Sequence, residues 1–339
     1  MQNIKDNSVD NFYESPAPHG GTFEVPINYD AQNDVYDTLT TPAIQKEYYE
    51  KEGYLIIRNL IPESLCDAAK EAFDKEVKSY QGYIYRQASA NPEKHKLTDY
   101  QYMINSILNI QSLDKNKFPV FREKGMEILT CKEFKSALNN LMSDDPKLVQ
   151  SMYFEGNPAT WAHQDSYYLD SSELGRMVGT WIAIEDIAPG AGRFYVYPKS
   201  HLIDMEKNGG DFDIAFNHDK YKKLVVDIIH QFKLECSAPV LRKGDVLFWH
   251  GKTIHGSLAT TQPEHSRSSF TGHYIPTSTD FLQYQSRIKK LNLKRVNGID
   301  VNFPKDQNES LNRLILNVET TFPTAFQMAK KLAIKLVTK

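Results

Sequence analysis

The chain has 339 residues, 40% of them hydrophobic and 24% charged, which is ordinary for a globular protein large enough to bury a sizeable core. Its 40 basic and 43 acidic residues leave a formal charge of −3, which gives no electrostatic reason to expect nucleic acid or an anionic membrane as a partner. Three widely spaced cysteines indicate reduced thiols and argue against a disulfide framework or a thiolate metal site.

The first residues contain no apolar signal core, and no segment reaches the length of a membrane span. We therefore expect a cytoplasmic protein. The oligomeric state cannot be read from these features. A chain of this length could hold two domains, but large β-rich single domains also reach this size.

In chain order, residues 1–40 are rich in Asn, Asp, Gly and Pro and predict an arm or loop. A helix is expected over 41–51, ending at Gly53, which suits a C-terminal cap. A strand over 54–57 follows, and a second helix begins near Pro62, where apolar residues recur at helical spacing.

Two further amphipathic helices are predicted over 118–129 and 132–143. From residue 148 onward the sequence pattern predicts short strands separated by turns that contain Gly and Pro. A helical insert over 219–232 interrupts them. The predicted strands are 149–156, 177–186, 192–198, 244–250 and 269–276. Helices before and within a set of short antiparallel strands indicate an α+β fold with a β core.

The most informative motif is His163-Gln164-Asp165. In an extended chain, residues i and i+2 point to the same side, so His163 and Asp165 can converge on one ion while Gln164 points away. Two imidazoles and one carboxylate with open coordination positions form the facial triad of non-heme iron(II) oxygenases. Ninety residues beyond Asp165 lies His255, and twelve residues further on lies Arg267. The four residues at these spacings form a pattern that is far more specific than the short motif alone.

Several blocks resemble the phytanoyl-CoA dioxygenase family in the same order. They are EKEGYLIIRNLIPESLCDAAK, HQD, MVGTWIAIEDIAPGAGRFYVYPKSH, KGDVLFWHGKTIHGS and SRSSFTGHY, and together they span roughly residues 45–275. The chain departs from the family pattern at Thr260, where asparagine is frequent, and at Gly192-Arg193, where a small apolar residue usually follows glycine.

The resemblance implies a double-stranded β-helix core, a cupin-like jelly roll with flanking helices, that binds Fe(II), 2-oxoglutarate and O2. It also suggests a division into an arm (1–40), a catalytic domain (41–280) with a helical insert at about 201–235, and a C-terminal extension (281–339) packed on the same domain.

By the same resemblance, His163, Asp165 and His255 are the expected iron ligands. Three other histidines lie near His255 in the sequence. His250 and Trp249 are both expected to have a structural role at the sheet surface, and His265 is expected in an exposed turn. His273 shares a strand face with Arg267 by the two-residue period, so it is predicted to line the pocket without binding iron.

Four residues are predicted to bind the cosubstrate. A buried carboxylate without a partner is costly, and the guanidinium fork of Arg267 can pair with the far carboxylate of 2-oxoglutarate. Ser257 could donate a hydroxyl to the same carboxylate, and Trp181 matches a family tryptophan near the cosubstrate. Gln164 could border the pocket. The plainer alternatives are a surface arginine, a core tryptophan and a surface glutamine.

The implied reaction is hydroxylation of an aliphatic C–H bond in a small-molecule metabolite, with release of succinate and CO2. Asp165 argues against halogenation, since related halogenases lack the carboxylate ligand. Desaturation, ring closure and epimerisation remain open with the same triad. So do a jelly-roll binding protein, a catalytically inactive relative and a zinc hydrolase, although a hydrolase would leave Arg267 unexplained.

Two segments, 78–104 and 201–232, are predicted to cover the open face of the iron site. The plainer alternative is that their tyrosines pack in the core and their lysines form a solvated helix face. Mixed hydroxyls, aromatic rings and Arg86 would suit a small oxygen- or nitrogen-rich metabolite better than a fatty acyl-CoA.

Overall fold

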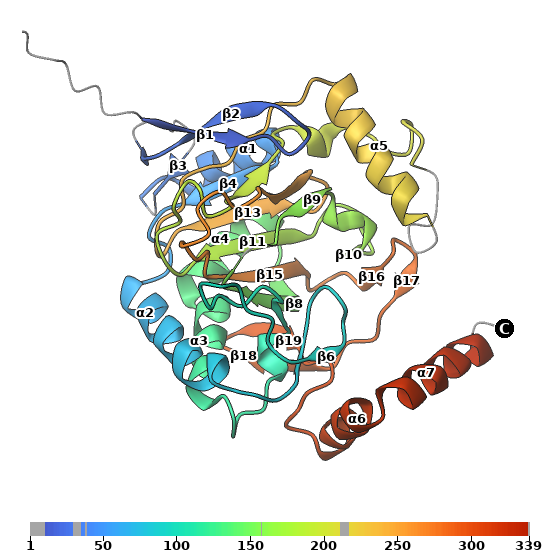
Figure 1. Cartoon of the computed structure of the whole chain (residues 1–339). Coiled ribbons are helices and arrows are strands. Elements are labelled where there is room, and N and C mark those ends of the chain that lie inside the picture. The colour runs from blue at the N-terminus through green and yellow to red at the C-terminus, as the bar shows by residue number, and fades with distance from the viewer. Residues whose placement is uncertain (1–10, 30–34, 38, 157, 211–216, 338–339) are drawn as a thin grey trace, which may run out of the picture.

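The computed structural model describes residues 11–29, 35–37, 39–156, 158–210 and 217–337, with side chains to residue 330. Its largest element is a sheet of nine strands (Figure 1). In spatial order the strands are β18 (Leu293–Val296), β19 (Ile299–Asn302), β8 (Pro146–Phe154), β15 (Ser269–Pro276), β11 (Val178–Ala183), β13 (Val246–His250), β4 (Tyr54–Ile57) and β3 (Val35–Tyr36), with β7 (Ile107–Leu108) paired to β8.

A second, smaller sheet contains β12 (Phe194–Val196), β14 (His255–Ser257) and β9 (Thr160–His163). The two sheets form the cupin-like jelly roll, so the predicted α+β fold is confirmed. The remaining strands form small pairs and a three-stranded sheet: β1 (Phe12–Pro16), β2 (Thr22–Pro26), β5 (Ile84–Tyr85), β6 (Pro92–Glu93), β10 (Leu169–Ser171), β16 (Phe281–Gln283) and β17 (Arg287–Ile288).

The predicted helices form close to their expected bounds. Gly53 follows the first of them with φ of +81°, and its N–H donates to the carbonyl of Tyr49. The helices and helical turns are α1 (Pro42–Glu52), α2 (Glu63–Ala72), η2 (Phe73–Lys78), η3 (Ile110–Ser112), α3 (Pro119–Thr130), α4 (Lys132–Met142), η4 (Asp165–Tyr167), η5 (Ser200–Leu202), α5 (His218–Gln231), α6 (Ser310–Thr321) and α7 (Pro323–Val337). Among the described helices, none is both long and apolar enough to cross a bilayer.

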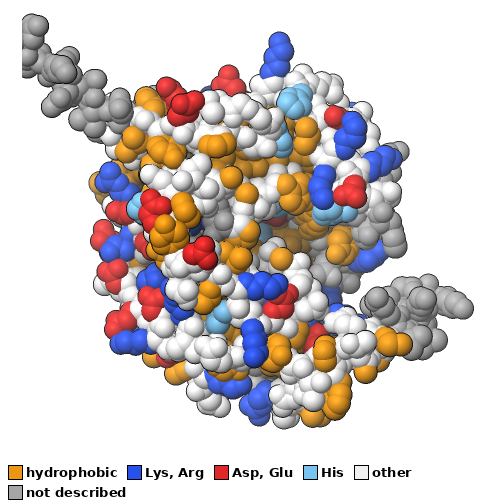
Figure 2. All heavy atoms as spheres, in the orientation of Figure 1, with side chains coloured by type: hydrophobic (Ala, Val, Ile, Leu, Met, Phe, Trp, Pro, Cys, Tyr) orange, Lys and Arg blue, Asp and Glu red, His pale blue; other side chains and the backbone are white. Residues whose placement is uncertain are grey.

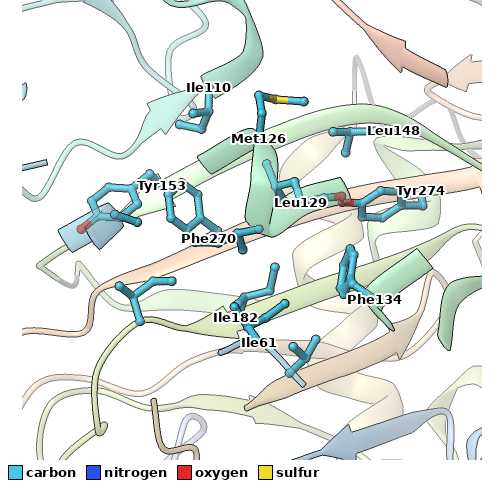
Figure 3. Close-up of a cluster of buried hydrophobic side chains, with 14 of the residues drawn as sticks. Ile61, Ile110, Met126, Leu129, Phe134, Leu148, Tyr153, Ile182, Phe270 and Tyr274 are labelled. Carbon is cyan, nitrogen blue, oxygen red and sulfur yellow. The ribbon is translucent and has the colours of Figure 1, made fainter. Parts of the chain in front are cut away.

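Alternation along the strands decides which side chains reach the interior of the jelly roll. On β13, Val246 and Phe248 face α2, α3 and α4 and join the main core shown in Figure 3. Leu247 and Trp249 face the other way, into the space between the two sheets. The same two-residue period on the neighbouring strands leaves one face of the large sheet for packing and the other for the site.

The N-terminal segment differs from the expected loop. Residues 12–26 contain an antiparallel hairpin, β1 paired with β2. The hairpin is held to the jelly roll by Arg193, which donates to the carbonyl of Pro26, and by a 2.7 Å hydrogen bond between the hydroxyls of Tyr13 and Thr261. Arg193, one of the departures from the family pattern, therefore anchors this hairpin. Residues 1–10 lie outside the described part.

Beyond residue 280 the chain adds strands to the large sheet. β19 pairs in parallel with β8, with Val301 opposite Leu148. The two last helices follow (Figure 1), and the buried Glu319 on α6 accepts a 2.8 Å hydrogen bond from the hydroxyl of Tyr85. The proposed borders at residues 40 and 280 remain predictions.

The predicted helical insert forms α5 and packs into a core of its own. Tyr221, Val225 and Ile228 on its buried face meet side chains such as Tyr167 and Tyr197. Residues 211–216 of the insert lie outside the described residues. That residues 201–232 cover the open face of the iron site remains a prediction.

Candidate metal centre

The small sheet brings the two candidate histidines together. His163 ends β9, His255 begins β14, and the two residues are direct partners in the antiparallel pairing. Their ring centroids are 4.4 Å apart. Asp165 begins the helical turn η4 immediately after β9, so its carboxylate turns back toward both rings.

The three side chains converge on one point. The Nε2 atom of His163 lies 3.7 Å from Oδ1 of Asp165, and Nε2 of His255 lies 3.6 Å from Oδ2. One ligand atom from each residue lies within 4.8 Å of the others. Within the described ranges, this is the one group of three or more metal-ligating side chains that meets this criterion, and His250 is outside it.

Backbone hydrogen bonds orient both imidazoles. Nδ1 of His163 lies 2.8 Å from the carbonyl oxygen of Trp161, and Nδ1 of His255 lies 2.9 Å from that of Thr253. A carbonyl only accepts, so each Nδ1 carries the proton and each Nε2 presents a lone pair to the shared point. This is the usual way in which a protein fixes the tautomer of a metal-binding histidine.

The charge balance of the centre also suits a cation. Burial acts to raise the pKa of Asp165, but the neighbouring His255, His273 and His163 hold that pKa well below its ordinary range. Burial lowers the pKa of His255 to about 4, against the opposing pull of Asp165. At neutral pH the centre thus offers one carboxylate and a neutral His255 ring. Two nitrogens, one oxygen and open positions fit iron(II).

Arg267 is buried, with 3% of its surface exposed. Its guanidinium lies 5.7 Å from the ring centre of Phe154 and 6.0 Å from that of Trp181. Nε has no hydrogen-bond partner among the described residues, and burial lowers the pKa of Arg267 to about 9. A buried cation with an unused donor fits an anionic ligand such as the far carboxylate of 2-oxoglutarate.

Of the other three predicted cosubstrate residues, one lies beside Arg267 and two have hydrogen-bond partners in the protein. Trp181 is buried on the inner face of β11, beside the Arg267 guanidinium. The hydroxyl of Ser257 accepts a 2.9 Å hydrogen bond from the backbone N–H of Thr160. Gln164 is buried, and its side chain donates to the carbonyl of Lys252, away from the ligand atoms. Their roles toward the cosubstrate remain predictions.

Two further residues contact Asp165, of which His273 was predicted to line the pocket and Trp249 was not assigned to the site from the sequence. Trp249 was expected at the sheet surface, yet it is 1% exposed and its indole N–H donates to Oδ2 of Asp165 at 2.8 Å. Nε2 of His273 lies 3.2 Å from the same oxygen. The two-residue period of a strand places Trp249 on the same face as Leu247, which is the inner face of the sheet.

Aromatic side chains form a wall beside His163. The ring of Trp161 lies 5.2 Å from that of His163 and 5.3 Å from that of His218, and Tyr168 lies 5.9 Å from both histidines. The ammonium of Lys222 lies 5.7 Å from the ring centre of Trp161. We call Trp161, Tyr168, His218 and Lys222 the aromatic wall.

The segment over 78–104 contacts the carboxylate of Glu155 through Lys78 and Met103, but Arg86 points into its own loop. Arg86 is 1% exposed and donates to the carbonyl of Asn105 at 2.9 Å and to His95 at 3.1 Å, so it organises its own loop. The N–H of Met103 donates to the carboxylate of Glu155 at 2.7 Å. The expectation that Arg86 contributes to substrate binding is not supported by this geometry.

The chain is similar to known proteins of one family. The family model described as "Phytanoyl-CoA dioxygenase (PhyH)" matches residues 49–268. "Phytanoyl-CoA dioxygenase domain-containing protein 1" of Danio rerio is 26% identical over 274 residues, which cover 70% of this chain and 91% of that protein.

Two solved structures share the fold. The alpha-ketoglutarate-dependent carbocyclase SnoK from nogalamycin biosynthesis has a TM-score of 0.51 at 19% identity, covering 75% of this chain and 90% of its own. EctD from S. alaskensis, solved with 2-oxoglutarate and 5-hydroxyectoine, has a TM-score of 0.52 at 13% identity, covering 89% and 99%.

Proposed function

The chain belongs to the phytanoyl-CoA dioxygenase family of iron(II)- and 2-oxoglutarate-dependent oxygenases, and on this premise we propose that it hydroxylates an aliphatic C–H bond of a small-molecule metabolite. The observation that carries the proposal is the convergence of His163, Asp165 and His255, together with the buried Arg267, whose Nε has no hydrogen-bond partner among the described residues. A zinc hydrolase would use the three ligands but has no task for Arg267.

In this proposal each residue has a defined task. His163, Asp165 and His255 would hold the iron and leave the remaining coordination positions to 2-oxoglutarate and O2. Arg267 binds the far carboxylate of 2-oxoglutarate, with Trp181 beside it, which fixes the cosubstrate in one orientation. The bound iron, with 2-oxoglutarate and O2, supplies the oxidation that is coupled to release of succinate and CO2.

The substrate class is proposed from the aromatic wall. Trp161 and Tyr168 offer ring faces beside His163, and Lys222 and His218 add polar groups at the edge. Flat aromatic faces with polar edges suit a ring-bearing, polar metabolite, as in secondary-metabolite biosynthesis. The protein is proposed to act in the cytoplasm, consistent with its three free cysteines. Acidic and basic side chains are interspersed over the face in Figure 2, which supports a small-molecule partner over nucleic acid.

The experiment is a substrate screen with the enzyme loaded anaerobically with Fe(II) and 2-oxoglutarate and then exposed to O2. Polar ring-bearing metabolites and a branched acyl-CoA form its two arms, and succinate release and product mass are the readouts. We expect succinate release and a product that gains one oxygen atom in the first arm. A product that instead loses two hydrogens would replace hydroxylation by desaturation or ring closure. Efficient turnover of the acyl-CoA would overturn the substrate class.

A further inference from the structure

Three residues form a row across the large sheet behind the candidate metal centre. Gly179 on the central strand β11 is the direct partner of Trp249 on β13 and of His273 on β15. A Cβ atom at Gly179 would lie 2.1 Å from Cε2 of the Trp249 indole, so the indole lies across the glycine. The Trp249 and His273 rings meet there at 5.9 Å and nearly at right angles, 88°.

Both rings direct a nitrogen to one oxygen of Asp165. The indole Nε1 lies 2.8 Å from Oδ2, and Nε2 of His273 lies 3.2 Å from the same atom. With the proton of His273 on Nε2, two N–H donors occupy both lone pairs of Oδ2. Nε2 of His255 also lies 3.6 Å from this oxygen, but it carries a lone pair and does not compete as a donor. The other oxygen of the carboxylate, Oδ1, lies 3.7 Å from Nε2 of His163, which is one of the candidate metal ligands.

We infer that Trp249 and His273 are positioning residues that restrict Asp165 to one metal-binding oxygen, Oδ1. The inference rests on the metal site of the proposed function. A carboxylate that bound through both oxygens would occupy an extra coordination position on the ion. With Oδ2 held by two donors, the protein contributes three ligand atoms and the other positions stay open for 2-oxoglutarate and O2.

The sheet explains why the arrangement needs a glycine. Any side chain at Gly179 would displace the indole from its place over β11 and take Nε1 away from Asp165. Gly179 thus affects the metal centre indirectly, through the position of the Trp249 indole. Glycine in a strand interior often marks such a close approach of another group.

The test uses variants that remove one donor at a time. Trp249→Phe keeps a ring but lacks the N–H, His273→Leu removes the second donor, and His273→Gln restores an N–H. His250→Gln is the matched control, because His250 is partly buried on the same strand as Trp249 but faces away from Asp165. Mn(II) affinity, measured by titration without cosubstrate or substrate, is the first readout. The carboxylate stretching frequencies of the Zn(II)-loaded protein, which distinguish one bound oxygen from two, are the second.

We expect Trp249→Phe and His273→Leu to weaken Mn(II) binding about 10- to 100-fold, as is usual for partners of metal ligands. His273→Gln and His250→Gln should stay close to the parent protein, and only the first two variants should change the carboxylate signature. Unchanged affinity in both donor variants, or an equal loss in His250→Gln, would overturn the inference. The His255→Ala variant distinguishes failure of this inference from failure of the proposed function. If His255→Ala also leaves Mn(II) binding intact, the proposed metal site is wrong.

Discussion

The backbone N–H of Arg267 donates a hydrogen bond to the carbonyl oxygen of Glu155, with the two atoms 2.6 Å apart. Glu155 is fully buried, and its carboxylate lies 2.7 Å from the ammonium of Lys78 and accepts from the N–H of Met103 at the same distance. The backbone that carries Arg267 is therefore fixed by contacts that do not involve its guanidinium. The Arg267 side chain can be changed while its surroundings stay in place.

Arg267→Ala should raise the 2-oxoglutarate requirement strongly while leaving iron binding intact. Truncating one member of a buried, hydrogen-bonded charge pair typically costs about 2–5 kcal/mol, and the expected loss of 2-oxoglutarate affinity corresponds to that range. The measurement is the 2-oxoglutarate Kd of the Fe(II)-loaded protein together with its Fe(II) affinity. An unchanged 2-oxoglutarate Kd would remove Arg267 from the cosubstrate site.

Each single substitution His163→Ala, Asp165→Ala and His255→Ala should abolish tight Fe(II) binding and turnover, because two protein ligands leave the ion too weakly held. Anaerobic Fe(II) titration and succinate release measure the two effects. His250→Ala is the control, since His250 is not part of the metal centre. If His250→Ala lost activity while His255→Ala kept it, the ligand assignment would be wrong.

Trp161→Ala and Lys222→Ala should raise the KM for the substrate about 5- to 10-fold, since an aromatic or cation–π contact is worth ~1 kcal/mol. Substrate-independent 2-oxoglutarate consumption should not change, because the His163 imidazole bonds the backbone of Trp161 rather than its side chain. Lys223→Ala serves as the control, as that lysine is exposed and pairs with Asp227. An equal rise in KM for the control would contradict a specific role for the wall.

Acid should destabilise the metal-free protein well above the pH at which carboxylates titrate. Burial lowers the pKa of His250 to about 3 and that of His255 to about 4, from an ordinary value of 6.5. The unfolded chain therefore binds more protons between these values, so stability is complete above pH 6.5 and is lost as the pH falls toward 4. At about pH 5 the loss is ~2 kcal/mol for each histidine.

Urea denaturation of the metal-free protein at neutral and acidic pH measures this loss. His250→Gln should reduce the difference between the two conditions by ~2 kcal/mol, because one of the two titrations is then absent. A variant with the same pH dependence as the parent protein would show that His250 is not buried in its neutral form.

The sequence predicted the elements that carry strong local patterns. The two-residue period placed His163 and Asp165 on one side of the chain, and the family blocks selected His255 over His250. The contribution of Trp249 depends on register across three strands, through Gly179 and His273, which no local pattern records. A large aromatic residue in a strand usually packs in the core, so the sequence of this strand does not show that Trp249 bonds Asp165.

Two errors have related physical causes. The N-terminal segment was predicted as an arm or loop because Asn, Asp, Gly and Pro are frequent in it, but residues 17–21 form the turn of the β1–β2 hairpin, which Arg193 holds from far along the sequence. Arg86 was predicted near the substrate because a charged residue among tyrosines suggested a binding surface. Its guanidinium instead satisfies carbonyls of its own loop, a role that depends on tertiary folding.

Helix α5 has one side that is fixed to the metal centre and another that is not. The Tyr221 hydroxyl accepts a 2.8 Å hydrogen bond from the N–H of Gln164, the residue between two ligands. His218 and Lys222, by contrast, lie beside the ring of Trp161, and Lys222 pairs with Asp219 on the same helix. During evolution, substitutions on the second side could change which molecules are accepted while Tyr221 preserves the ligand geometry. A single helix would then let new substrate preferences arise without rebuilding the iron chemistry.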